Sequence, residues 1–443
     1  MTEVRGTEGW SASALLGRIP VSNAPDEREA RQAARRHRMA PYLVWILLIA
    51  SIVPWRRSVY FEGSFDPVVI AKAVVGIAAL LFALLGARRS SLRNPIGITS
   101  IAFVAAFAGV ALIGGDASGN FTAAGVSTVR IGIVAAAIVF VVRSTPPLEV
   151  IRSLLTSMAL FGLFAAASGV ASVAGGDRLV ATLPPLNPND IALLCAAPAI
   201  GLLHELIIGN RRWSRGVPML ALLIAIVVLT QSRTGLLAML AAFVVVFLHA
   251  RRLRPNAVIA LVLLVPFTAA AVTLTNLITS VAERGDASGQ NIVTLSSRTI
   301  AWQAVLSTPE TSWAHWIGSG MAVRQVQVAG QYWDNQVLDS SWFSALAQAG
   351  VIGVVIMAGW IVVVASWSFR ARTLRSITTP LITFLVIRSF LENGLIDTNM
   401  MFVLFFSVAL ILESDHLMRS REERPESPQR AGIRALLSVR PGA

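Results

Sequence analysis

The stretch VPMLALLIAIVVLTQSRTGLLAMLAAFVVVFLHA, residues 217–250, consists of two apolar runs with a short polar segment between them. The runs Val217–Thr230 and Thr234–Ala250 predict two short membrane-spanning helices, which are short enough to be tilted or partial spans. A charged side chain in the middle of such a helix costs roughly 2.5 to 3.5 kcal/mol. We therefore expect Arg233 to lie in the turn between the two helices.

The composition of the whole chain supports this fold class. Only 14% of the 443 residues are charged and 55% are hydrophobic, whereas soluble domains carry about 25% charged residues. Alternating apolar segments of about 10 residues, which are typical of membrane β-barrels, are not evident. The sequence therefore predicts an all-α polytopic membrane protein. The net charge of +13 does not indicate nucleic-acid binding, because the arginines lie mostly in short connections between spans.

We predict about twelve transmembrane helices, with a large outward-facing loop, residues 280–341, before the tenth. A basic, disordered cytoplasmic arm is expected over residues 1–39, a transmembrane catalytic domain over 40–412 and a cytoplasmic tail over 413–443. The predicted spans are Ala40–Trp55, Val68–Ala87, Pro95–Gly114, Thr122–Val142, Leu148–Ala174, Asp190–Ile208, Val217–Thr230, Thr234–Ala250, Asn256–Thr279, Trp342–Phe369, Thr378–Ile396 and Thr398–Leu412.

The distribution of arginines predicts the orientation of these spans. Alternate connections are rich in arginine, as in Arg211–Arg215 and Arg370–Arg375, and both termini fall on the same side as these connections. Cytoplasmic loops carry such an excess of cations, so we expect both termini in the cytoplasm. Arg56 and Arg57 are exceptions, because they follow the first span on the opposite side.

Several polar residues on the predicted outer side are not required by topology. A guanidinium is a charged fork of donors that suits an anionic group with several oxygens, such as a diphosphate. This is one interpretation of Arg178, Arg233 and Arg298; the other is that each reaches lipid headgroups or fixes a loop. Arg388 and Glu392 bind substrate or form only an ion pair within one helix. The remaining candidates for substrate binding are Asn187, Asn189 and Arg324.

The outer loop also contains signs of local order. The segment SSRTIAWQAVLSTPE, residues 296–310, predicts a short amphipathic helix that begins at Ser296 or Ser297 and stops before Pro309. The sequence GSG at residues 318–320 predicts a turn. An outer loop of this length is uncommon unless it is functional.

Three stretches resemble motifs of the bacterial O-antigen ligase and polysaccharide polymerase superfamily, which is similar to other membrane-embedded C-type glycosyltransferases. The segment LNPNDIALL, residues 186–194, resembles its NPN-x-x-A motif, and LTQSRTGLLAML, residues 229–240, resembles its T-x-S-R-G/T helix pair. The segment DSSWFSALAQAGVIG, residues 339–353, resembles its HN-x-x-L-x-x-L-x-x-x-G-x-x-G helix. Arg298 and Trp302 match an R-x-x-x-W step, and Gly318 and Gly320 match a G-x-G.

The resemblance implies transfer of glycans from a polyprenyl-diphosphate carrier at the outer face of the bacterial cytoplasmic membrane. It assigns Arg233 to the carrier diphosphate. The family histidine that activates the acceptor hydroxyl is replaced here by Asp339, and a carboxylate can act as that base. This departure favours a polymerase of repeat units over a ligase. Asp339 also suits the N-cap of the following helix, and the two roles can coexist.

The expected partners are a lipid-linked glycan donor, an acceptor glycan, the bilayer and other envelope polysaccharide proteins, without nucleic acid. We expect no cofactor and no metal site, since the five histidines are scattered and there is one cysteine. Tyr332, Trp333 and Trp342 are candidates to position the acceptor. The alternative function is a polytopic transporter or a flippase of lipid-linked glycans, although no internal repeat is visible. A peptidoglycan-type polymerase would share the mechanism but not these motif spacings.

Overall fold

The computed structural model describes residues 39–56, 66–208, 212–249, 296–328 and 335–422. Residues Pro41–Ala443 form one compact unit, and the description below concerns that unit. The ninth predicted span, Asn256–Thr279, lies outside the described residues, as do Tyr332 and Trp333. The predicted arm lies outside them too, apart from its last residue, and so does the tail beyond Glu422.

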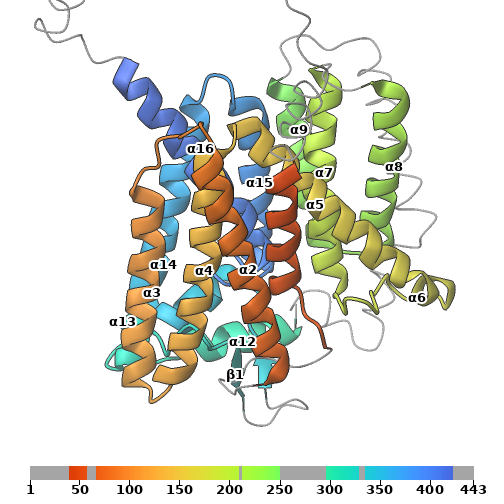
Figure 1. The fold of residues 1–443 in the computed structure, drawn as a ribbon. Helices are drawn as coiled ribbons and strands as arrows, with labels where there is room; N and C mark the ends of the chain where they lie inside the picture. Colours follow the sequence, from red (N-terminus) through yellow and green to blue (C-terminus); the bar gives the residue numbers. More distant parts are fainter. Residues whose placement is uncertain (1–38, 57–65, 209–211, 250–295, 329–334, 423–443) are drawn as a thin grey trace, which may run out of the picture. The chain divides into compact units, whose positions relative to one another are not determined.

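The described residues form helices almost throughout, joined by short connections (Figure 1). An additional helix, without a label in the figure, covers Met39–Ile52. The labelled elements are α2 Pro67–Arg89, α3 Thr99–Ala117, α4 Phe121–Ser144, α5 Pro147–Ser168, α6 Val170–Ala174, α7 Pro188–Ile207, α8 Trp213–Leu229, α9 Arg233–His249, α12 Ser296–Leu306, α13 Trp313–Ile317, β1 Gln325–Gln327, β2 Asn335–Val337, α14 Ser341–Arg370, α15 Arg375–Leu391 and α16 Met400–Glu422.

Seven helices within the described residues are long and apolar enough to cross a membrane: α2, α3, α4, α5, α7, α14 and α16. The helix Met39–Ile52, α8 and α9 are apolar but shorter. These helices confirm the predicted class, a helical membrane protein, whereas the number of about twelve spans stays a prediction. The helices α7 and α16 are buried on almost all sides, while α2 exposes much of its apolar surface, as expected for a helix that faces lipid.

The described parts of the predicted outward-facing loop, residues 296–328 and 335–341, form what we call the outer segment. Its helices and strands lie together at one end of the long helices. In Figure 1 the helices α12 and α13 and the strand β1 lie together at the lower end, and β1 pairs with β2 in a small antiparallel sheet. The predicted amphipathic helix corresponds to α12, which buries Ala301 and Val305. The end of α3 meets this segment, because a Cβ atom on Gly114 would lie 2.3 Å from the carbonyl oxygen of Ile317.

Among the boundaries that differ from the sequence-based prediction are those of α15 and α16. The span predicted over Thr378–Ile396 ends earlier, because α15 stops at Leu391 and Glu392 has an extended backbone, with φ −139° and ψ 138°. The last predicted span, Thr398–Leu412, belongs to a longer helix, α16, that runs to Glu422. The buried Glu413 of α16 accepts hydrogen bonds from the backbone amides of Thr99 and Ser100, at 2.7 and 3.1 Å. This carboxylate therefore caps α3, whose first amides have no partner within the helix.

The outer segment is hydrogen-bonded to the rest of the protein at a break in α14. Gly350 interrupts the helix with φ 65° and ψ −163°, a conformation that is essentially restricted to glycine. The carbonyls of Ala347 and Gln348 accept instead from the amides of Ser319 and Gly320, at 2.9 and 3.0 Å. The G-x-G turn thus satisfies the backbone groups near the break.

We expect Gly350→Ala to destabilise the protein strongly. A Cβ atom there would lie 2.2 Å from the carbonyl carbon of Trp316, and the unfavourable backbone conformation alone costs about 1 to 3 kcal/mol. Thermal melting of the purified protein should show a clear decrease in Tm. Gly86→Ala on α2 is the matched control, since its Cβ would meet no atom within 4 Å. Equal melting temperatures for the two variants would contradict this account of the break.

Candidate functional site

A pocket of about 980 Å³ lies where the helix ends on the predicted outer side converge. The helix Met39–Ile52 contributes its last residues, and α2, α4 and α7 contribute their first halves. Asp339 and Glu392 line the pocket from the start of α14 and the end of α15. Its polar lining residues include Arg56, Asp66, Lys72, Arg130, Asn187, Asp190, Arg324, Asp339, Glu392, Asn393 and Asn399. The pocket therefore collects both cations and carboxylates at one end of the helices.

Asp339 is available for chemistry because it does not cap α14. The cap is Ser340, whose side chain accepts a hydrogen bond from the amide of Trp342 at 3.3 Å. The predicted capping role of Asp339 is thus wrong, since the helix begins one residue later than that role requires. Its side chain is 42% exposed and lines the pocket. Partial burial raises the pKa of Asp339 above its ordinary value, and the neighbouring Arg298 offsets part of that increase.

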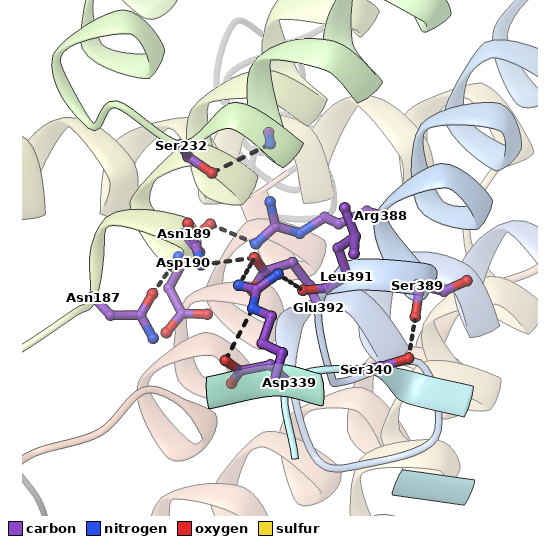
Figure 2. Close-up of polar contacts among 12 residues, drawn as sticks. Asn187, Asn189, Asp190, Ser232, Asp339, Ser340, Arg388, Ser389, Leu391 and Glu392 are labelled. Atoms are coloured by element: carbon purple, nitrogen blue, oxygen red, sulfur yellow. Dashed lines mark hydrogen bonds and ion pairs between the residues drawn. The ribbon is translucent and has the colours of Figure 1, made fainter. Parts of the chain in front are cut away.

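Arg298 on α12 links Asp339 to the end of α15. Its Nε lies 3.3 Å from Oδ2 of Asp339, and its Nη2 lies 3.5 Å from Oε1 of Glu392. Its Nη1 donates to the carbonyl of Leu391 at 2.9 Å. Figure 2 shows the two carboxylates on either side of this network of contacts. Arg298 therefore holds both carboxylates in place, and these contacts occupy all three of its guanidinium nitrogens.

Glu392 is fixed by several groups from distant parts of the chain (Figure 2). Its Oε1 accepts from Nδ2 of Asn189 at 2.7 Å, and its carbonyl accepts from Oγ of Ser341 at 2.9 Å. Arg388 donates to the carbonyl of Asn189 at 2.5 Å, but within the described residues it forms no ion pair with Glu392. The interpretation of Arg388 and Glu392 as a simple intrahelical pair is therefore wrong, because α15 ends before Glu392 and Arg298 is its partner.

Asn187 has a structural function at the edge of the pocket. Its side chain accepts a hydrogen bond from the amide of Asp190 at 2.8 Å and so caps α7 (Figure 2), as asparagine commonly does at this position. Pro188 follows at the first helical position, where its missing N–H costs nothing. The sequence NPND thus sets the start of α7 and places Asn187 and Asp190 on the pocket wall.

Arg233 and Arg178 lie beside the turn between α8 and α9, outside the pocket lining. Arg233 is the first residue of α9 and is exposed, and its side chain forms no hydrogen bond or ion pair with another described residue. Arg178 donates from Nε to the carbonyl of Thr230 at 3.3 Å. A Cβ atom on Gly235 would lie 2.9 Å from that of Ala192, so this turn packs next to the first turns of α7.

A comparison against known families matches the part of the chain that contains several of these features. Arg233 begins α9, Arg298 pairs with Asp339, and the G-x-G turn packs against α14. Residues 218–358 match the family of O-antigen ligases. No curated protein matches the chain. The resemblance inferred from the motifs is thereby confirmed, and with the apolar helices it supports a multi-pass membrane protein of polysaccharide biosynthesis.

The O-antigen ligase match covers Arg233, Arg298, Arg324 and Asp339. Arg178, Asn187, Asn189, Arg388 and Glu392 lie outside the matched residues, so their place in the site rests on the contacts described above. Trp342 lies within the match but packs away from the lining, with its Nε1 3.1 Å from Oγ of Ser389 and its ring stacked on Phe390. Its expected role in positioning an acceptor therefore has no support from this geometry.

Sequence reasoning missed two cations of the pocket that also lie outside the O-antigen ligase match. Lys72 on α2 and Arg130 on α4 both line the pocket. The sequence does single out both residues, because each lies within a predicted apolar span. An ionisable residue within a membrane segment is by default a candidate for function.

Proposed function

We propose that this protein transfers saccharide units from a polyprenyl-diphosphate carrier to an acceptor glycan at the outer face of the cytoplasmic membrane. The observation that carries the proposal is the carboxylate of Asp339, which faces a pocket of about 980 Å³ and is held by Arg298. The O-antigen ligase match supports a glycosyltransferase reaction. Such a donor already carries an activated sugar, so the reaction needs no nucleotide sugar.

In the proposed reaction, an acceptor hydroxyl attacks C1 of the donor sugar. The bond between C1 and the phosphate oxygen breaks, and the carrier leaves as its free diphosphate. Asp339 accepts the hydroxyl proton, which makes the oxygen a better nucleophile. Direct displacement of this kind inverts the configuration at C1. Glu392, held 3.5 Å from Arg298, is another carboxylate on the pocket wall.

The leaving diphosphate needs cations as its negative charge grows. We assign this function to Arg233, which is exposed next to the start of α7 and has its guanidinium available. Arg178 supports the same turn through the carbonyl of Thr230. A guanidinium offers a planar fork of donors that matches phosphate oxygens in pairs.

Arg298 acts in this proposal as a positioning residue for Asp339. Its positive charge lowers the pKa of Asp339, against the increase caused by burial. Transfer requires the ionised carboxylate, so activity should be lost as the pH falls through this raised pKa. In Arg298→Gln the lowering contribution is removed, and the acidic limb of the pH–kcat profile should move to higher pH. A profile that loses amplitude without moving would indicate a purely structural role for Arg298.

Analysis of lipid-linked glycans in a deletion strain tests the proposed function in cells. Without the protein, the donor should accumulate as a polyprenyl-diphosphate glycan, and polymer or ligated product should be missing. The chain length of that product distinguishes a polymerase from a ligase. Expression of the parent protein should reverse both changes. An unchanged pool of lipid-linked glycan in the deletion strain would contradict the proposal.

A further inference from the structure

Three cations from different parts of the chain line the same pocket: Lys72 from α2, Arg130 from α4 and Arg324 from the segment before β1. All three are half-buried. Their charges lie close enough to affect one another, since Lys72 and Arg130 each interact electrostatically with Arg324. Like charges in a partly buried setting repel one another more strongly than they do in water.

Hydrogen bonds to nearby carbonyls use only some of the N–H donors of these cations. Nζ of Lys72 donates to the carbonyl of Ile52 at 3.2 Å, and Nη2 of Arg130 donates to the carbonyl of Ser51 at 2.9 Å. These are carbonyls at the end of the helix Met39–Ile52, which attract cations. A lysine has three donors and an arginine has five, so most donors of this group remain unused by these two contacts.

The carboxylate that attracts Arg130 does not neutralise the three cations, because both of its oxygens have other partners. Asp397 attracts Arg130, but Oδ1 of Asp397 accepts from Nε2 of Gln348 at 3.2 Å and Oδ2 accepts from Nδ2 of Asn393 at 2.8 Å. Within the described residues, Lys72, Arg130 and Arg324 form no ion pair. These three residues thus concentrate positive charge in one part of the pocket, and a bound anion there would compensate it.

We propose that Lys72, Arg130 and Arg324 form a subsite for an anionic group of the substrate, either a phosphate or a carboxylate. Only the identity of the ligand rests on the proposed function. The group has two sources: the diphosphate of the carrier, or an acidic sugar of the glycan. In the first case the subsite contributes to binding of the carrier. In the second it selects glycans that carry a negative charge, and neutral glycans are poorer substrates.

Binding measurements with the purified full-length protein test the subsite. The probes are inorganic pyrophosphate and a uronic acid oligosaccharide, with the carboxyl-reduced oligosaccharide as the neutral counterpart. We expect Lys72→Gln and Arg324→Gln to weaken binding of one probe about tenfold or more. Arg89→Gln is the matched control, because it removes an exposed charge from the opposite end of α2. Lys72→Arg, which keeps the charge, should preserve most of the affinity.

The outcomes separate the two sources and the two proposals. Weaker pyrophosphate binding with unchanged oligosaccharide binding assigns the subsite to the carrier diphosphate, and the reverse assigns it to an acidic sugar. Affinities for both probes equal to those of Arg89→Gln, or no binding of either probe by the parent protein, would overturn the subsite. A protein that binds the probes through these cations but does not transfer glycan would contradict the proposed function and leave the subsite intact.

Discussion

Asp339→Asn should abolish glycan transfer by the purified protein while binding of the lipid-linked donor survives. The amide is nearly isosteric with the carboxylate but cannot accept the proton of the attacking hydroxyl. A positioned general base contributes about 10²- to 10⁴-fold to the rate, so kcat should decrease by that factor. Donor binding should be retained, because Arg233 and the pocket cations are unchanged. The measurements are single-turnover kinetics and donor affinity.

Two controls make the result with Asp339 specific. Glu310→Gln removes an exposed carboxylate from the same outer segment, away from the pocket lining, and should transfer at the parental rate. Thermal melting should show that Asp339→Asn remains folded, since Ser340 still caps α14. Full activity of Asp339→Asn would show that the base lies elsewhere, and Glu392 would be the next carboxylate to examine.

Arg233→Ala should lose nearly all transfer activity, and Arg233→Lys should lose much of it. Lysine keeps the positive charge but not the planar fork that binds two phosphate oxygens. A lost hydrogen bond to a charged group costs about 1.5 to 3 kcal/mol, or about ten- to a hundredfold in rate or affinity. The measurement is turnover of a defined polyprenyl-diphosphate glycan, with folding checked by thermal melting.

The Lys variant separates chemistry from topology. An arginine that only orients the protein in the membrane should tolerate lysine, because the positive-inside rule concerns lysine and arginine alike. Arg215→Lys provides the comparison, since Arg215 is exposed near the start of α8 in a connection predicted to be cytoplasmic. Parental turnover by folded Arg233→Lys would contradict the assignment of Arg233 to the diphosphate.

The fold class followed from the sequence because membrane insertion imposes a strong pattern. A segment such as Val68–Ala87 is apolar enough to lie in lipid, where a helix satisfies the backbone hydrogen bonds within the segment. The helix α2 covers this segment. The end of α15 was placed too late, although Glu392, Asn393 and Gly394 interrupt the apolar run there. The dipeptide Asn393–Gly394 is a turn signal, and Gly394 indeed adopts φ 129°.

The candidate site could be predicted only in part. Asp339 and Arg298 were found through motif positions, but their contact depends on how α12 packs against α14 and α15, which no local pattern encodes. Asn187 and Asn189 were expected to bind substrate, whereas Asn187 caps α7 and Asn189 holds Glu392. Such functions depend on hydrogen-bond partners up to 203 positions away in the chain.

The central claim is that the pocket transfers glycan rather than moving it across the membrane. The most direct measurement uses purified protein in vesicles that contain a polyprenyl-diphosphate glycan and an acceptor glycan. The account predicts a longer or ligated glycan, inverted at the anomeric carbon that is transferred, with equimolar release of free polyprenyl diphosphate. Movement of the intact lipid-linked glycan between leaflets, without a new glycosidic bond, would contradict the account and favour a transporter.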